Sequence, residues 1–161
     1  MIVVLMGVSG SGKTTIGTTL AEELGWPFLD GDDFHPPENV AKMSAGTPLT
    51  DEDRWPWLDR LNSELRAREA KSESAVLACS ALKQAYRDRL ARGLAHWKLV
   101  FLHASFELLH RRIEERKHKY MPASLLQSQF ATLEPPAKAI QIDVAEPLER
   151  SVERIRAALQ R

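Results

Sequence analysis

The chain has 161 residues, a length that predicts one compact domain over residues 1–161 with its own buried core. Lysine and arginine together number 22, as do aspartate and glutamate, so no overall positive charge attracts nucleic acid, and nucleic acid is not an expected partner. The only cysteine, Cys79, excludes an internal disulfide and fits a cytoplasmic location, while the apolar opening over residues 1–6 is too short to cross a membrane.

Short apolar segments alternate along the chain with longer segments in which apolar residues recur every three or four positions. This alternation is typical of βαβ units that build a parallel sheet. The apolar segments predict strands at Ile2–Met6, Pro27–Asp30, Ala75–Cys79, Lys98–His103 and Ala139–Asp143. The amphipathic segments predict helices at Lys13–Leu24, Asp53–Glu69, Gln84–Gly93, Ser105–Lys117 and Pro147–Gln160. The expected architecture is a three-layer α/β domain with five parallel strands.

A helix start is predicted near residue 52. Thr50 and Asp53 stand three positions apart and resemble a capping box with a short acid. Pro56 is compatible with a helix that begins here only if it falls in the first turn. Residues 72–74 and 135–136 are predicted to be loops.

Residues 7–14 read Gly-Val-Ser-Gly-Ser-Gly-Lys-Thr and match the P-loop pattern between an apolar strand and a helix. Glycines let backbone N–H groups surround phosphate oxygens, and the following helix points its positive end at the same anion. Lys13 is expected to contact the β- and γ-phosphates as a catalytic residue, and the Thr14 hydroxyl to coordinate Mg²⁺. The predicted ATP-binding residues of this loop are Gly7, Val8, Ser9, Gly10, Ser11, Gly12, Lys13, Thr14 and Thr15.

A P-loop alone does not separate a kinase from a GTPase switch or a motor ATPase. Guanine-selective switches usually carry an Asn-Lys-x-Asp element, but the two asparagines, Asn39 and Asn62, precede Val and Ser. The chain also has little room for the sensor elements of large ATPases. A small-molecule kinase fits these observations best.

Carboxylates follow the second predicted strand, where open parallel sheets bind ligands. Phosphorylation of a hydroxyl group needs a carboxylate that orients the hydroxyl and accepts its proton, and Asp32 is the candidate for this catalytic role. Asp30 is placed to hold a water molecule on Mg²⁺. His35 is either a donor to a substrate hydroxyl or a structural residue. The alternative for the group is an Asp-rich turn that closes a strand.

Basic residues occur in two further segments near the predicted site. Arg54 offers a planar pair of donors that suits the carboxylate of a sugar acid, although it can instead pair with its acidic neighbours. Ser80 is expected to bind acceptor hydroxyls, and Lys83 or Arg87 to neutralise the carboxylate or the transferring phosphoryl group. Arg87 and Asp88 can equally form a pair on a helix surface.

A basic stretch ends the fourth predicted helix. Arg112 and Arg116 stand four residues apart and share one helix face, so we expect a lid over roughly residues 112–124 that closes on the nucleotide. In this interpretation Arg112 binds ATP and Arg116 takes part in catalysis. The alternative is a solvated helix end whose cations offset the helix macrodipole.

Taken together, the motifs resemble those of the gluconokinases, small P-loop kinases related to shikimate and adenylate kinases. The resemblance covers nearly the full length of the chain. It rests on GVSGSGKT at 7–14, FLDGDDFHP at 28–36, PLTDEDRWPWL at 48–58, CSALKQAYRDRL at 79–90, MPASLLQSQFATLEP at 121–135 and DVAEP at 143–147.

The resemblance implies ATP-dependent phosphorylation of D-gluconate to 6-phospho-D-gluconate, dependence on Mg²⁺, a strand order of 2-3-1-4-5, a closing lid and often a homodimer. It places Gln129 near the mouth of the active site, as a substrate-binding residue, and the turn after Asp143 in the adenine pocket. The lid of relatives usually reads Gly-His-Phe, whereas His118-Lys119-Tyr120 stands here, so His118 and Lys119 receive no role.

Two other functions stay open at this point. One keeps the kinase but changes the acceptor to shikimate or another polyhydroxy acid. The other is a non-catalytic module that exposes a binding surface when ATP is bound.

Overall fold

The computed structural model describes residues 1–116 and 123–161. In it, five parallel strands form one sheet in the order β2-β3-β1-β4-β5, which is the order that the family resemblance implies. The strands are β1 (Ile2–Met6), β2 (Phe28–Asp30), β3 (Ala75–Ala78), β4 (Trp97–His103) and β5 (Ile140–Asp143). Each lies where an apolar segment predicted it, with bounds that differ by at most one residue.

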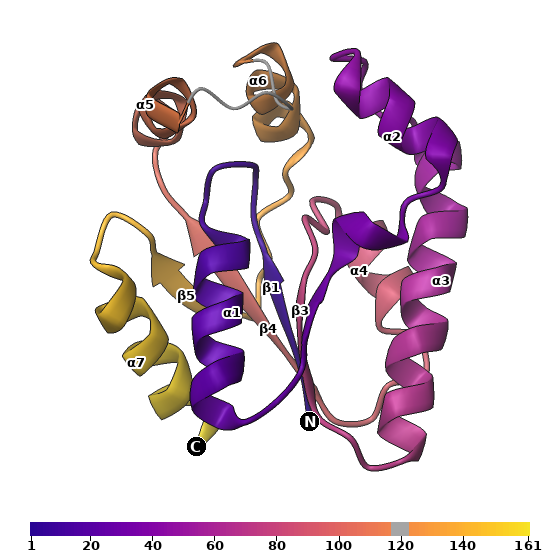
Figure 1. The fold of residues 1–161 in the computed structure, drawn as a ribbon, viewed down its shortest axis with the longest axis vertical. Coiled ribbons are helices and arrows are strands. Elements are labelled where there is room, and N and C mark those ends of the chain that lie inside the picture. Colours follow the sequence, from indigo (N-terminus) through magenta and orange to yellow (C-terminus); the bar gives the residue numbers. More distant parts are fainter. Residues whose placement is uncertain (117–122) are drawn as a thin grey trace.

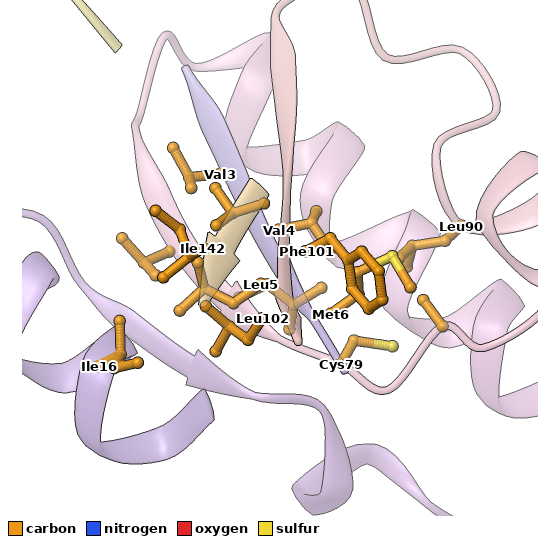
Figure 2. Packing of buried hydrophobic residues seen from close by; sticks show 14 of the residues in the cluster. Val3, Val4, Leu5, Met6, Ile16, Cys79, Leu90, Phe101, Leu102 and Ile142 are labelled. Carbon is orange, nitrogen blue, oxygen red and sulfur yellow. The ribbon is translucent and has the colours of Figure 1, made fainter. Parts of the chain in front are cut away.

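The centre of the sheet is its most buried part. All five residues of β1 are fully buried, and Val3 pairs with Val76 of β3 on one side and with Lys98 of β4 on the other. Figure 2 shows side chains of β1, β4 and β5 gathered in one cluster. Helices cover both faces of a parallel sheet, which explains why β1 is apolar throughout instead of alternating.

Helices form the outer layers. Figure 1 shows α1 (Lys13–Leu24) and α7 (Leu148–Leu159) on one side of the sheet and α3 (Asp51–Ala70) and α4 (Gln84–Leu90) on the other. The three-layer α/β architecture is confirmed. None of the helices in the described part of the chain is long and apolar enough to span a membrane.

Three elements were not predicted, and all lie beyond the carboxyl ends of the strands, where α5 (Phe106–Arg116) is also found (Figure 1). They are the short 3₁₀ helix η1 (Gly31–Phe34), α2 (Pro37–Ser44) and α6 (Ala123–Thr132). In α2 only Asn39 is buried, so this helix lacks the apolar periodicity that identifies a covering helix.

The capping box at the start of α3 is confirmed. The Thr50 hydroxyl accepts a hydrogen bond from the Asp53 amide at 3.1 Å, and the Asp53 carboxylate accepts one from the Thr50 amide at 2.8 Å. The helix begins at Asp51, which agrees with the start predicted near residue 52 and lies two residues before the amphipathic segment that begins at Asp53. Pro56 therefore lies inside the helix and not in its first turn, at the expense of a hydrogen bond to the Glu52 carbonyl.

Candidate active site

A cavity of about 530 Å³ opens at the carboxyl edge of the sheet. Its walls come from the P-loop, the β2–η1 segment, the start of α3, the end of β3, and α6. This volume lies in the usual range of small-molecule sites. Segments that are far apart in the sequence thus line one space, at the sheet edge where the sequence predicted a site.

The P-loop leaves the start of α1 open to a ligand. Gly12 is the N-cap residue, with a φ of 90° that an L side chain rarely adopts, and no side chain caps the helix. The first N–H groups of α1 therefore stay available for an anion. The cavity is lined here by Ser9, Gly10, Gly12, Lys13, Thr14 and Thr15. Gly7, Val8 and Ser11, which were also predicted to bind ATP, are buried residues of the loop and do not line the cavity.

Lys13 lies across the loop that binds phosphate in P-loop proteins. Its Nζ atom donates hydrogen bonds to the carbonyl oxygens of Gly7 at 2.8 Å and Val8 at 3.1 Å. Burial lowers the pKa of Lys13, and the carboxylates of Asp32 and Asp30 act in the opposite direction. The two carboxylates of the β2–η1 segment thus favour the charged form of the Lys13 ammonium group, against the effect of burial.

Asp30 and Asp32 both line the cavity but have different surroundings. The Asp30 carboxylate caps η1 by accepting a hydrogen bond from the Asp32 amide at 3.0 Å, and burial raises the pKa of Asp30. The Asp32 side chain is 78% exposed and extends into the open space. Asp32 is therefore free of the capping role and accessible to a ligand.

His35 also lines the cavity, although it is a buried residue. Its ring stacks on Trp57, with ring centroids 4.0 Å apart and planes 17° apart. The Trp57 indole in turn donates a hydrogen bond to the Gly31 carbonyl at 2.7 Å. Burial and the charge of Arg54 lower the pKa of His35 to about 4, so the imidazole is neutral near neutral pH.

Arg54 lines the cavity from the first turns of α3, and its side chain is 15% exposed. The Nη1 atom donates hydrogen bonds to the Leu49 carbonyl at 2.7 Å and to the Tyr86 hydroxyl at 2.9 Å. Tyr86 donates its own proton to Asp51, and this bond lowers the pKa of Asp51. The Arg54 Nη1 atom also lies 3.9 Å from the Asp51 carboxylate. Arg54 thus pairs with an acidic neighbour and lines the cavity at the same time.

Ser80 and Gln129, both predicted substrate-binding residues, line the same space. The Gln129 side chain accepts a hydrogen bond from the Ser9 amide at 2.7 Å, which joins α6 to the P-loop. Arg112 lies on α5, and its guanidinium donates to the Val144 carbonyl at 2.7 Å. This bond joins α5 to the turn after Asp143, where the family resemblance places the adenine.

Lys83 and Arg87 are not among the residues that line the cavity. The Lys83 ammonium lies 3.4 Å from the Asp51 carboxylate and 5.6 Å from the centre of the Tyr86 ring. Asp51 and Tyr86 in turn contact Arg54, which does line the cavity. Lys83 therefore contacts Arg54's partners and does not line the cavity, where it was expected to neutralise a ligand.

Arg87 is buried and has a structural environment. Its guanidinium donates to the carbonyl oxygens of Ala81 at 2.8 Å, Leu82 at 3.1 Å and Glu134 at 2.8 Å. Ala81 has a φ of 45°, a left-handed conformation that L residues rarely adopt. Arg87 thus joins the β3–α4 loop to the segment after α6, and it does not line the cavity in which it was expected to meet the substrate.

Part of the predicted lid, over residues 112–124, lies outside the described residues. This applies to residues 117–122, which include His118 and Lys119, and to the side chains of Arg116, Ala123 and Ser124.

Two residues near the site were missed. Asn39 contacts His35, and Tyr86 contacts Arg54. The spacing of four residues between His35 and Asn39 is a helical signal that could have linked them. Tyr86 and Arg54 are 32 residues apart, and no local pattern indicates their contact.

The donor groups of the cavity suit Mg²⁺ bound through a nucleotide. Within residues 1–116 and 123–161, no cluster of three or more His, Cys, Asp or Glu side chains forms a closed metal site. Mg²⁺ characteristically uses substrate phosphates, water and one or two protein oxygens. The Thr14 hydroxyl and the Asp30 and Asp32 carboxylates line the same cavity and fit that requirement.

Comparison with known proteins identifies the family. Residues 9–141 match the family model of shikimate kinase. A probable gluconokinase from Xenopus tropicalis is 48% identical, with 100% of this chain and 94% of the relative aligned. The chain belongs to the gluconokinase family. As a P-loop kinase, it uses a nucleotide as phosphate donor and acts on a small molecule.

Solved structures agree with this assignment. A sugar kinase from Janibacter sp. HTCC2649 is 47% identical, with a TM-score of 0.93 over 99% of this chain and 94% of that one. A gluconokinase from Sinorhizobium meliloti 1021 is also 47% identical, with a TM-score of 0.89 over 98% of this chain and 90% of that one. The prediction of a P-loop kinase fold is thereby confirmed.

Proposed function

We propose that the chain transfers the γ-phosphoryl group of ATP to a hydroxyl group of D-gluconate, which forms ADP and 6-phospho-D-gluconate. The observation that carries this proposal is the cavity itself, because Lys13, Asp32 and Arg54 all line it. An acceptor with both a hydroxyl group and a carboxylate matches these groups. Full-length relatives named gluconokinase support D-gluconate as that acceptor.

Asp32 is proposed as the catalytic base. Its exposed carboxylate orients the acceptor hydroxyl and takes up its proton, while the new O–P bond forms and the bond between the γ-phosphorus and the ADP oxygen breaks. Lys13 and the N–H groups at the start of α1 hold the phosphates and balance the charge that moves onto ADP.

Mg²⁺ is proposed as the metal cofactor. Thr14 would hold it, and Asp30 would hold one of its water molecules. When bound, the ion neutralises charge on the β- and γ-phosphates.

Four residues are proposed to recognise the acceptor. Arg54 binds the carboxylate, because a guanidinium supplies two parallel charge-assisted hydrogen bonds. His35 and Ser80 bind hydroxyl groups, and Gln129 lies at the mouth beside Ser9. Arg112 and Arg116 are proposed to belong to a lid that shields the phosphates from water.

Asp32→Asn tests the mechanism. If Asp32 is the base, turnover should fall by at least about 10²-fold while ATP affinity stays nearly unchanged. Asp33→Asn is the matched control, because Asp33 is the next residue of η1, is exposed and does not line the cavity. Turnover of Asp32→Asn equal to that of Asp33→Asn would remove Asp32 from this role.

A panel of acceptors with coupled ADP detection tests the substrate. We expect turnover with D-gluconate and much less with shikimate and other polyhydroxy acids. Turnover with another acid but not with gluconate would refute the substrate assignment. Tight ATP binding without phosphate transfer to any small acid would instead favour the nucleotide-controlled binding module.

We also propose that residues 1–161 act as one kinase domain, that the chain forms homodimers in the cytoplasm, and that it has no nucleic-acid or membrane partner. The single buried thiol of Cys79 supports a location in the cytoplasm. The equal numbers of acidic and basic residues support the lack of a nucleic-acid partner. The family resemblance supports the homodimer. Sedimentation equilibrium should give twice the chain mass, and a monomer mass would refute the homodimer.

A further inference from the structure

His35 and Asn39 form a hydrogen-bonded pair on the acceptor side of the cavity. His35 is the cap residue that follows η1, and Asn39 lies four residues further on, in α2. Both residues are buried, with 8% and 2% of their surface exposed. The Asn39 Nδ2 atom lies 3.1 Å from His35 Nδ1 and 2.9 Å from the main-chain oxygen of Asp53. The pair therefore joins η1, α2 and the first turn of α3.

The Asp53 carbonyl determines the orientation of the Asn39 amide. A carbonyl oxygen only accepts hydrogen bonds, so the amide nitrogen, and not the amide oxygen, must face Asp53. The same nitrogen carries a second proton, and its other neighbour is His35 Nδ1. The Nδ1 atom must therefore offer a lone pair.

We infer that Asn39 selects the tautomer of His35 in which Nε2 carries the proton and presents it to the acceptor side of the cavity. A neutral imidazole has one ring proton, which resides on Nε2 when Nδ1 accepts a hydrogen bond. The inference deepens the proposed function and rests on it, because the acceptor hydroxyl is the group that meets this proton. Asn39 is thus a positioning residue that acts through His35.

The charge state and the placement of the ring agree with this tautomer. An imidazolium would carry a second proton on Nδ1, opposite an N–H group of Asn39. Burial and the neighbouring Arg54 guanidinium lower the pKa of His35 to about 4, which keeps the ring neutral. Stacking on Trp57 holds the plane of the ring, and Nε2 then lies 3.8 Å from Asp32 Oδ1.

This 3.8 Å gap between a donor and an acceptor suits one hydroxyl group. It is too long for a direct hydrogen bond, but an oxygen about 2.8 Å from both atoms would accept from His35 Nε2–H and donate to the Asp32 carboxylate. With the other tautomer, both atoms would be acceptors, and a hydroxyl with a single proton would leave one of them unpaired. Asn39 thereby makes the site selective for a hydroxyl group between His35 and Asp32.

Nitrogen-15 NMR of the ligand-free full-length protein near neutral pH tests the tautomer without any catalysis. Long-range nitrogen–proton couplings in labelled histidine rings report which nitrogen carries the proton, and the His35 signals are assigned by their absence from His35→Gln. We expect a protonated Nε2 and an unprotonated Nδ1. A proton on Nδ1, alone or together with one on Nε2, would overturn the inference.

Asn39→Asp, which replaces the two amide donors by acceptors at nearly constant volume, should shift the ring proton to Nδ1 or add a second proton. Asn62, the other asparagine of the chain, provides a matched control. It is also buried, and its Nδ2 atom donates to the carbonyl oxygens of Leu90 and Arg92, both at 2.8 Å, outside the cavity. Asn62→Asp should lower the Tm comparably and leave the His35 spectrum unchanged.

Kinetics with D-gluconate complete the test. Asn39→Asp should lower kcat/KM for the acid at least about tenfold and leave the KM for ATP within about twofold, because a misdirected donor leaves a polar group unpaired. Asn62→Asp should change neither value. Equal kinetic effects of the two variants would overturn the positioning role.

The two proposals fail in distinguishable ways. A protein with the Nε2–H tautomer but no turnover of gluconate would refute the proposed function and leave the tautomer assignment intact. An active protein with the Nδ1–H tautomer would refute the role of Asn39 alone.

Discussion

Arg54 and Arg87 carry the same guanidinium group in different surroundings. Arg54 has two hydrogen bonds at one nitrogen, to Leu49 and Tyr86, and lines the cavity. Arg87 instead donates to three carbonyl oxygens and is buried. The first arrangement orients a cation toward a ligand, whereas the second stabilises a loop.

Replacement of each arginine by lysine should separate these roles. Arg54→Lys should raise the KM for gluconate at least about tenfold, because an ammonium cannot form the parallel pair of bonds that a guanidinium forms with a carboxylate. Arg87→Lys should instead destabilise the fold by about 2–4 kcal/mol, because buried carbonyl groups lose their donors. Steady-state kinetics and urea unfolding of both variants measure the difference. A large rise in the KM for gluconate in Arg87→Lys at unchanged stability would contradict the structural role.

The short helix η1 is positioned by close contact with β3. A Cβ atom added to Gly31 would lie 2.7 Å from the Ala78 carbonyl oxygen, so a side chain at this position displaces backbone atoms. Gly31 also accepts the hydrogen bond from Trp57, and Asp32 is the next residue. Any displacement of Gly31 should therefore also move Asp32, the proposed base.

Gly31→Ala should destabilise the protein by about 1–3 kcal/mol through overpacking and raise the KM for the acceptor. Gly25→Ala is a control with a different cause of strain. Gly25, which ends α1, has a φ of 71° but open space around its missing Cβ, so alanine there should cost about 1–2 kcal/mol and leave the KM unchanged. Thermal unfolding and kinetics measure both effects. An acceptor KM that stays constant in Gly31→Ala would show that η1 tolerates the displacement.

The capping box of α3 predicts a defined pH dependence. The hydrogen bond from Lys42, at 2.7 Å, and the bond from the Thr50 amide lower the pKa of Asp53 to about 2. Because the folded-state pKa lies below the unfolded value of about 3.9, ionised Asp53 stabilises the fold above about pH 4, and this contribution is lost as the pH falls toward about 2.

Asp53→Asn should therefore be less stable than the unmodified chain at neutral pH, and the difference should shrink between about pH 4 and about pH 2. Urea unfolding at a series of pH values measures this difference. Lys42→Met provides a double-mutant control, since it should destabilise the unmodified chain more than the Asp53→Asn variant. A difference in stability that does not vary with pH would contradict the ionic contribution of Asp53.

The cavity combines a nucleotide half and an acceptor half that belong to different parts of the chain. Lys13 and Thr14 begin α1, whereas Asp32 and Arg54 lie on η1 and α3. Ligands that bind only the folded protein raise its stability by mass action. Stabilisation by ATP should therefore depend on the nucleotide half and not on the acceptor half.

ATP with Mg²⁺ at about 100 times its Kd should stabilise the chain by about 2.7 kcal/mol. Asp32→Asn should retain this gain, because it alters the acceptor half, whereas Lys13→Met should lose most of it. The Tm with and without nucleotide measures the gain. Loss of stabilisation in Asp32→Asn equal to that in Lys13→Met would show that the two halves do not act separately.

Local patterns were enough to predict much of this molecule. Strands buried on both faces are apolar throughout, so the five strands were found to within one residue. The P-loop and the capping box also depend on residues a few positions apart, and both occur as predicted. The family motifs added the strand order, which no local pattern contains.

The direction of each side chain depended on contacts between distant segments. Lys83 and Arg87 stand close to Ser80 in the sequence, yet only Ser80 lines the cavity. Arg87 instead donates to the carbonyl oxygens of Ala81 and Leu82 in its own loop and to that of Glu134, 47 residues later. Spacing along the chain predicts which residues share an element, but the packing of elements against one another determines which of their side chains reach the ligand.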